Sequence, residues 1–193
     1  EAEEDILRLG GGSETEMNQS IVKSTKKRFI WLFLNLLTAI LASVVISLFD
    51  ASIEKMVALA ILMPIVASMG GNAGTQTLTL TVRSLATKEL VDTNRKKVFM
   101  KEISISVLNG IIFAVLTSLA TILWFNDSSL ALIVGAAMII NIFSAGLFGF
   151  LIPYSLNYLK IDPALASSVF VTTVTDVFGF LSFLGLASLF LFS

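Results

Sequence analysis

Five long stretches of this chain are almost free of charged side chains, and each is long enough to cross a lipid bilayer. They cover residues 29–49, 56–82, 103–126, 128–159 and 163–192. A transmembrane helix needs about 20 predominantly apolar residues. Five consecutive segments of this length cannot all lie inside so small a soluble protein, and β-barrel strands would show short alternating segments instead. We therefore predict an all-α, polytopic membrane protein with five transmembrane helices per subunit.

The composition agrees with a lipid environment and disfavours most kinds of membrane enzyme. Of the 193 residues, 55% are hydrophobic and 14% are charged, whereas soluble domains carry about 25% charged residues. The chain has no Cys and no His. This excludes disulfides, thiolate or imidazole metal sites, and Ser-His or Cys-His catalysis. We expect neither an enzyme nor a nucleic-acid-binding protein.

The basic residues predict how the chain is oriented. Twelve of the 13 Lys and Arg residues precede the first span or lie in the second or fourth connection, and only Lys55 lies on the other side. Basic loops stay in the cytoplasm under the positive-inside rule. We therefore expect a cytoplasmic N-terminus, an external C-terminus and a multi-pass location in the plasma membrane.

Residues 1–28 differ in kind from the predicted transmembrane domain, residues 29–193. The first nine residues can form an acidic amphipathic helix, Gly10 to Gly12 interrupt it, and a polar segment with a basic collar leads to the membrane. Because there is no initiating Met, we expect a fragment of a longer protein. The segment is either a junction with cytosolic domains outside this chain or a solvated tail whose basic cluster binds lipid headgroups.

One carboxylate, Asp176, stands in the middle of the last predicted span. It follows Pro163 by 13 residues, which at the helical rise is roughly 20 Å into the membrane. Burying an aspartate there costs at least about 2.5–3.5 kcal/mol, so such residues usually face a bundle interior or a water-filled cavity and mark an ion or proton path. The alternative is a protonated Asp176 that bonds to a Thr and joins two helices. Four residues share its helical face: Ser168, Thr172, Thr173 and Gly179.

The second predicted span changes at its middle from apolar to small and polar residues. Three glycines there permit either a close backbone approach or an unwound turn with free carbonyl oxygens: Gly70, Gly71 and Gly74. Four polar residues recur at helical spacing, as in a pore wall: Asn72, Gln76, Thr79 and Arg83. The alternative is a tightly packed helix interface in which Thr hydroxyls bond back to their own helix. The remaining intramembrane amides, Asn35, Asn109 and Asn141, are expected to join helices through hydrogen bonds.

A symmetric dimer would complete a cation site at Asp176. The chain has no internal repeat, but two copies about a twofold axis would place two Asp176 carboxylates across one path. Without a cation at least one would bind a proton, because burial and like charge both disfavour ionisation. A divalent cation would let both stay ionised, and Mg2+, which keeps much of its water, suits so few protein ligands better than Ca2+.

Three segments together resemble the membrane domain of the MgtE family of magnesium channels. They are PIVASMGGNAGTQTLTLTVRSLAT, the RKKVFMKE ahead of the third span, and the closing DPALASSVFVTTVTDVFGF. The combination of GGNxGxQ with a later TTxTDxxG is the most specific part, and the resemblance covers residues 56–193. It implies a homodimeric, Mg2+-selective channel whose pore is built from the second and fifth spans.

The resemblance also implies roles for individual residues. Asp176 matches the family's pore aspartate, which binds hydrated Mg2+. Five residues match the motifs around the ion: Thr172, Gly70, Gly71, Asn72 and Gly74. Five more would line the pore: Gln76, Thr79, Ser168, Thr173 and Gly179. The family often has a small residue and Pro where Ser168 and Val169 stand here, which is a departure from its pattern.

The segment EAEEDILRLGG resembles the end of the helix that links the family's cytosolic regulatory domains to the pore. Those domains bind Mg2+ and close the pore, and Glu1, Glu4 and Asp5 match acidic positions at their interface with it. We expect the regulatory domains to lie outside this chain, which would then conduct without normal Mg2+ feedback.

The resulting hypothesis is a Mg2+ channel driven by the membrane potential. Two alternatives remain. The first is a Na+- or H+-coupled divalent cation exchanger in which Asp176 alternately binds the metal and the coupling ion. The second is a noncatalytic membrane scaffold whose polar residues only join helices.

Overall fold

The structure is a computed structural model that describes residues 20–91 and 93–191, apart from the side chains of residues 27 and 164–166. This part of the chain forms helices and no strand, which confirms the all-α prediction. The helices are α2 (Ile21–Ser47), α3 (Asp50–Lys55), α4 (Ala58–Ala86), α5 (Arg95–Phe125), α6 (Ser128–Tyr158) and α7 (Pro163–Leu191). All except the short α3 are long and apolar enough to cross a membrane. The predictions for Glu1, Glu4 and Asp5 lie outside the described residues.

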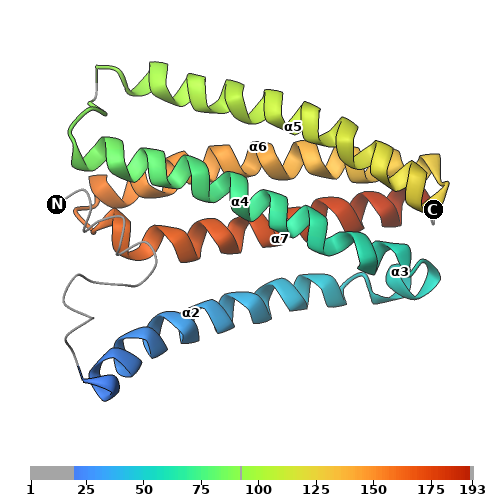
Figure 1. Cartoon of the computed structure of the whole chain (residues 1–193), viewed down its shortest axis with the longest axis horizontal. Coiled ribbons are helices and arrows are strands. Elements are labelled where there is room, and N and C mark those ends of the chain that lie inside the picture. Colours follow the sequence, from blue (N-terminus) through green and yellow to red (C-terminus); the bar gives the residue numbers. More distant parts are fainter. Residues whose placement is uncertain (1–19, 92, 192–193) are drawn as a thin grey trace.

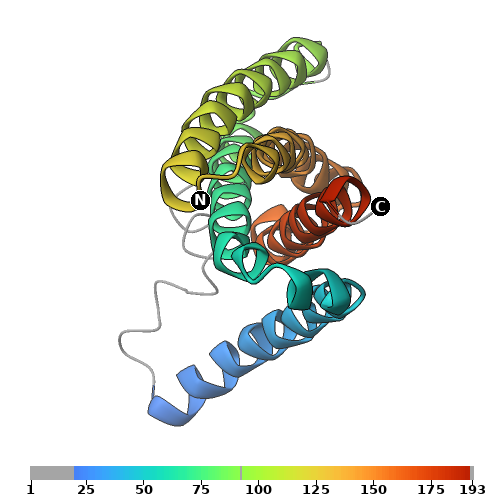
Figure 2. The same ribbon diagram turned by 90° about the vertical axis from the view of Figure 1, so that its right-hand side faces the viewer.

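Helix α6 is the centre of the bundle. Helices α4, α5 and α7 each pack against it, α4 and α7 also pack against each other, and α2 packs against α7. Seen along the bundle, α2 and α5 extend from opposite sides of this core (Figure 2). Helix α6 is apolar all around and buries residues along its whole length, as expected of a helix surrounded by others. Helices α2 and α5 instead expose many large apolar side chains, which suits contact with lipid.

Helices α4 and α7 run antiparallel through the core (Figure 1). Near one end, Leu59 and Leu62 of α4 share an apolar cluster with Phe183 of α7. Near the other end, Leu78 of α4 contacts a cluster that includes Val171 of α7. The middles of α4, α6 and α7 therefore lie at one level between these clusters.

The turn from α5 to α6 is set by two residues. Helix α5 ends at Phe125 and is followed by Asn126, which adopts the left-handed conformation with φ 51°, a conformation that Asn tolerates better than most residues. Asp127 then caps α6, because its carboxylate accepts hydrogen bonds from the backbone N–H groups of Ser129 (2.9 Å) and Leu130 (3.0 Å). Such a cap satisfies donors that the first helical turn leaves free.

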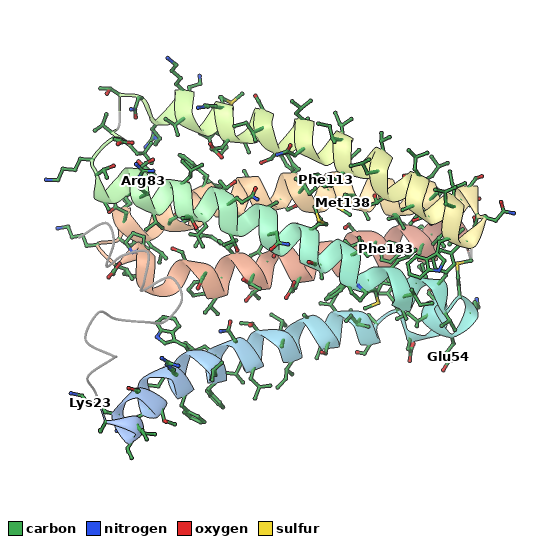
Figure 3. All side chains as sticks on the ribbon, viewed as in Figure 1. Lys23, Glu54, Arg83, Phe113, Met138 and Phe183 are labelled. Carbon is green, nitrogen blue, oxygen red and sulfur yellow. The ribbon has the colours of Figure 1, made fainter. Side chains whose placement is uncertain are left out.

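Two helices begin earlier than the apolar pattern predicts. Helix α2 begins at Ile21 and α5 at Arg95, whereas the predicted spans began at residues 29 and 103. The added turns carry basic side chains, and Lys23 and Arg83 lie at the same end of the bundle while Glu54 lies at the other (Figure 3). Apolarity marks only the part of a helix inside hydrocarbon. Backbone hydrogen bonding continues into the headgroup region, where Lys and Arg can reach water.

Small residues bring α5 against α6. Ser118 of α5 donates a hydrogen bond to the backbone oxygen of Ala131 in α6 (2.8 Å). A Cβ atom built on Gly135 would lie 2.5 Å from Ser118 Oγ, and one built on Gly146 would lie 2.6 Å from Ser106 Cβ. Close contact between small residues is a common way for membrane helices to associate. Side chains larger than glycine at these positions would force the helices apart.

We predict that Gly146→Ala lowers the thermal unfolding midpoint in detergent, because overpacking costs about 1–3 kcal/mol. The matched control is Gly185→Ala in α7, where the nearest atom to a built Cβ, Phe49 Cζ, is 3.9 Å away. This control should melt at or slightly above the wild-type temperature. Equal midpoints for the two variants would contradict the packing described for α5 and α6.

Candidate functional site

Asp176 lies at mid-length of α7, 13 residues after Pro163 and 15 before Leu191. Its side chain is partly exposed. No hydrogen bond or ion pair joins its carboxylate to any residue in the described part of the chain. The neighbouring hydroxyls bond to their own helix instead: Thr173 donates to the oxygen of Val169 (2.6 Å) and Thr175 to that of Thr172 (2.9 Å). A bond between Asp176 and a Thr of the same chain is therefore not observed.

The side chain of Asp176 lies on a different side of α7 from that of Phe178. Phe178 packs on Phe148 of α6, with ring centroids 5.6 Å apart. Two residues along a helix differ by about 200° in direction, so Asp176 points to the side of α7 opposite Phe178. Thr172, one turn earlier on that side, is exposed.

The middle of α4 has a buried face that packs against α6 and α7. A Cβ atom built on Gly74 would lie 2.7 Å from Val171 Cγ1 and 3.3 Å from Thr175 Cγ2, and one on Gly70 would overlap the Asn141 side chain of α6. The predicted close approach is thus confirmed at both glycines. The predicted alternative of an unwound turn is wrong, because α4 is one helix from Ala58 to Ala86 and its carbonyl groups accept helical hydrogen bonds.

The opposite face of α4 is polar and open. No atom lies within 4 Å of a Cβ built on Gly71. Asn72 and Gln76 are exposed, and Thr79 is partly exposed. Asn72 follows Gly70 by two residues, so it points about 200° away from the contact with α6. The packing interface expected from the sequence is therefore one side of α4, and the polar residues expected of a pore wall lie exposed on the other.

Sequence reasoning missed two members of this open face, Ser68 and Thr75. Both are exposed; Ser68 accepts a hydrogen bond from Asn72 Nδ2 (3.5 Å), and Thr75 donates one to the oxygen of Gly71 (2.8 Å). The i−4 spacing of Ser68 from Asn72 could have identified it. The position of Thr75 could not be inferred without knowing which side of α4 the neighbouring helices cover.

Asp176 is level with Gly71. Helices α4 and α7 are antiparallel, Gly74 lies against Val171 and Thr175, and four residues further along Gly70 and Gly179 both contact Asn141. Asp176 falls between those two levels. We call the open residues at and around this level the α4–α7 polar face: Ser68, Gly71, Asn72, Thr75, Gln76 and Thr79 of α4, with Thr172 and Asp176 of α7.

The remaining predicted site residues lie elsewhere. Gly70, Gly74 and Gly179 are buried in helix contacts. Ser168 and Thr173 are partly exposed nearer the start of α7. Arg83, the last residue of the predicted stripe, is exposed near the basic end of the bundle (Figure 3).

The chemistry of the α4–α7 polar face is that of a partial cation site. It offers one carboxylate, neutral amide and hydroxyl oxygens, and an unfilled space at Gly71. Among the described residues, no three His, Cys, Asp or Glu side chains come together to hold a metal. A cation that keeps most of its water needs few direct protein ligands, as Mg2+ does.

Comparison with known proteins gives a consistent result. The model of the MgtE family, described as a divalent cation transporter, matches residues 63–186. The magnesium transporter MgtE of Thermus thermophilus is 34% identical over 194 residues, which cover 99% of this chain and 43% of that protein. MgtE of Bacillus subtilis is 30% identical, over 100% of this chain and 43% of that protein. MgtE of Enterococcus faecalis is 30% identical, over 99% and 42%. The chain spans less than half the length of these relatives.

We predict that water reaches the polar face of α4 but not the lipid-facing side of α5. The chain has no Cys, so a single-cysteine variant carries one thiol. A charged methanethiosulfonate reagent should modify Asn72→Cys, because the reactive thiolate forms in water. It should leave Leu116→Cys unmodified, although Leu116 is exposed on α5. Equal modification rates in the two variants would contradict an aqueous polar face.

Proposed function

Because this chain belongs to the MgtE family of divalent cation transporters, we propose that it conducts Mg2+ along the α4–α7 polar face. The family comprises multi-pass membrane transporters and not enzymes. This agrees with the multi-pass membrane location and with the non-enzymatic function that we expected from the sequence. One observation carries the proposal. The carboxylate of Asp176 is partly exposed, has no partner among the described residues and lies at mid-length of α7, level with Gly71. Of the three glycines of α4, Gly71 is the one where an added Cβ atom would meet no other atom within 4 Å.

We propose that two copies complete the path. Polar groups at membrane depth are tolerated only where they face protein or water, so the polar face of one chain requires a partner. Two Asp176 carboxylates match the charge of one divalent cation. A second copy that meets the first at α4 and α7 would leave the apolar surfaces of α2 and α5 toward lipid.

The ion passes as partly hydrated Mg2+. The absence of a side chain at Gly71 leaves room for its water shell opposite Asp176. Asn72 and Thr172 contact that shell, and Gln76, Thr79, Ser168 and Thr173 continue the polar lining on either side. The roles of Gly70, Gly74 and Gly179 are indirect, because these residues allow α4, α6 and α7 to pack closely behind the ion.

The basic end of the bundle faces the cytoplasm, in accordance with the positive-inside rule. An inside-negative potential then drives Mg2+ inward without a coupling ion, since each charge gains about 2.3 kcal/mol per 100 mV. The relatives are more than twice as long as this chain. We propose that cytosolic regulatory domains are its physiological partners.

Neutralising Asp176 should abolish most of the flux. In liposomes loaded with a Mg2+ indicator and given an inside-negative potential, Asp176→Asn and Asp176→Ala should each lower the initial uptake rate about tenfold or more, which corresponds to about 1.4 kcal/mol of lost stabilisation. The control is Glu54→Gln, which removes an exposed carboxylate at one end of the bundle (Figure 3) and should conduct like wild type.

Three outcomes of this assay would contradict the proposal. Wild-type rates in both Asp176 variants would refute the site. Uptake driven uphill by an imposed H+ or Na+ gradient would identify an exchanger. A wild-type chain that folds and inserts but carries no Mg2+ would leave the scaffold alternative.

A further inference from the structure

Asn141 of α6 is an amide buried at the level of Asp176, behind the α4–α7 polar face. Its side chain is fully buried (0% exposed). Its Nδ2 donates a hydrogen bond to the backbone oxygen of Val66 in α4 (2.7 Å). This confirms the prediction that Asn141 joins two helices. Its Oδ1 has no hydrogen-bond partner in the described part of the chain.

Two glycines make room for this amide. A Cβ atom built on Gly179 of α7 would lie 2.7 Å from Asn141 Nδ2, and one built on Gly70 of α4 would overlap the amide. Gly179 follows Asp176 by less than one helical turn, and Gly70 adjoins Gly71. The Asn141 side chain of α6 thus contacts both α4 and α7. It does so on their buried side, next to the residues at the centre of the polar face.

Stability does not explain an amide at this position. A buried acceptor without a partner is destabilising, and the Val66 oxygen already accepts a hydrogen bond within α4. An apolar side chain of similar size would fill the same space without an unpaired oxygen. An apolar side chain could not replace the directional hydrogen bond that the amide donates to α4 while it also packs against Gly179 of α7.

We propose that Asn141 is a positioning residue for the ion path, an inference that rests on the proposed Mg2+ conduction. The bond to Val66 fixes the height of α4 relative to α6. The contact with Gly179 fixes α7 against the same point, so that Asp176 stays level with Gly71 and Asn72. A small relative shift of α4 and α7 would change how the site fits a hydrated Mg2+ ion while the bundle remains folded.

Asn141→Leu tests this inference most directly, because leucine keeps the approximate volume and removes both polar groups. The variant should melt no lower than wild type. Its half-saturating Mg2+ concentration should nevertheless rise about fivefold, the change expected from one buried hydrogen bond, and its selectivity for Mg2+ over Ca2+ should fall. Asn141→Ala, which also removes volume, should show the same functional change.

A double-mutant cycle tests the contact with α7. Gly179→Ala alone should reduce uptake because its methyl group displaces the Asn141 amide. Asn141→Ala combined with Gly179→Ala should recover part of that loss, since residues in contact are not additive. Gly185→Ala, whose added methyl meets only ordinary contact, is the control and should leave uptake unchanged.

The outcomes separate this inference from the proposed function. If wild type conducts Mg2+ and depends on Asp176, yet Asn141→Leu keeps the wild-type half-saturation and selectivity, Asn141 is structural and the inference is wrong. Strictly additive effects in the cycle would also overturn it. If wild type conducts no Mg2+, the proposed function is wrong, and the inference about Asn141 is wrong with it.

Discussion

A polar group inside a membrane must face protein or water, and this constraint gives α4 the two faces on which the rest of the structure depends. Gly70 and Gly74 bring the backbone of α4 against α6 and α7. The opposite side of the same helix turn carries Asn72 and Gln76, which are exposed. Lipid cannot solvate these amides. The close packing of the buried face against α6 and α7 fixes how α4 and α7 lie along each other, and it brings Asp176 level with Gly71.

In the proposed ion path, three amino-acid types at mid-length of the bundle have separate tasks. Charge is supplied by Asp176, and no described neighbour neutralises it. Space is supplied by Gly71, and packing by Gly70, Gly74 and Gly179. Asn141 connects the packing to the polar face through its bond to Val66. This division explains why neighbouring glycines in one motif serve different purposes, since successive residues of a helix point about 100° apart.

The sequence was sufficient to predict five membrane-capable helices, a carboxylate at mid-length of the last helix and close helix contact at the glycines, because each depends on length, composition or periodicity. It could not decide between pore wall and packing interface for the middle of α4. Periodicity shows that Asn72 and Gly70 lie on different sides but not which side the neighbouring helices cover. For the same reason Thr75 was missed. The early starts of α2 at Ile21 and α5 at Arg95 escaped prediction because hydropathy reports contact with hydrocarbon, whereas a helix is held by backbone hydrogen bonds that continue beyond it.

The position of a bound cation tests the central claim most directly. Mn2+ accepts octahedral oxygen coordination similar to that of Mg2+ and can be located by anomalous X-ray scattering at its absorption edge, in crystals of the wild-type chain grown in lipid. We predict an anomalous peak at mid-membrane beside the Asp176 carboxylate, on the side of α4 that carries Gly71 and Asn72, and its loss in Asp176→Ala. A wild-type peak only at other positions, or one that persists unchanged in Asp176→Ala, would contradict the proposed ion path.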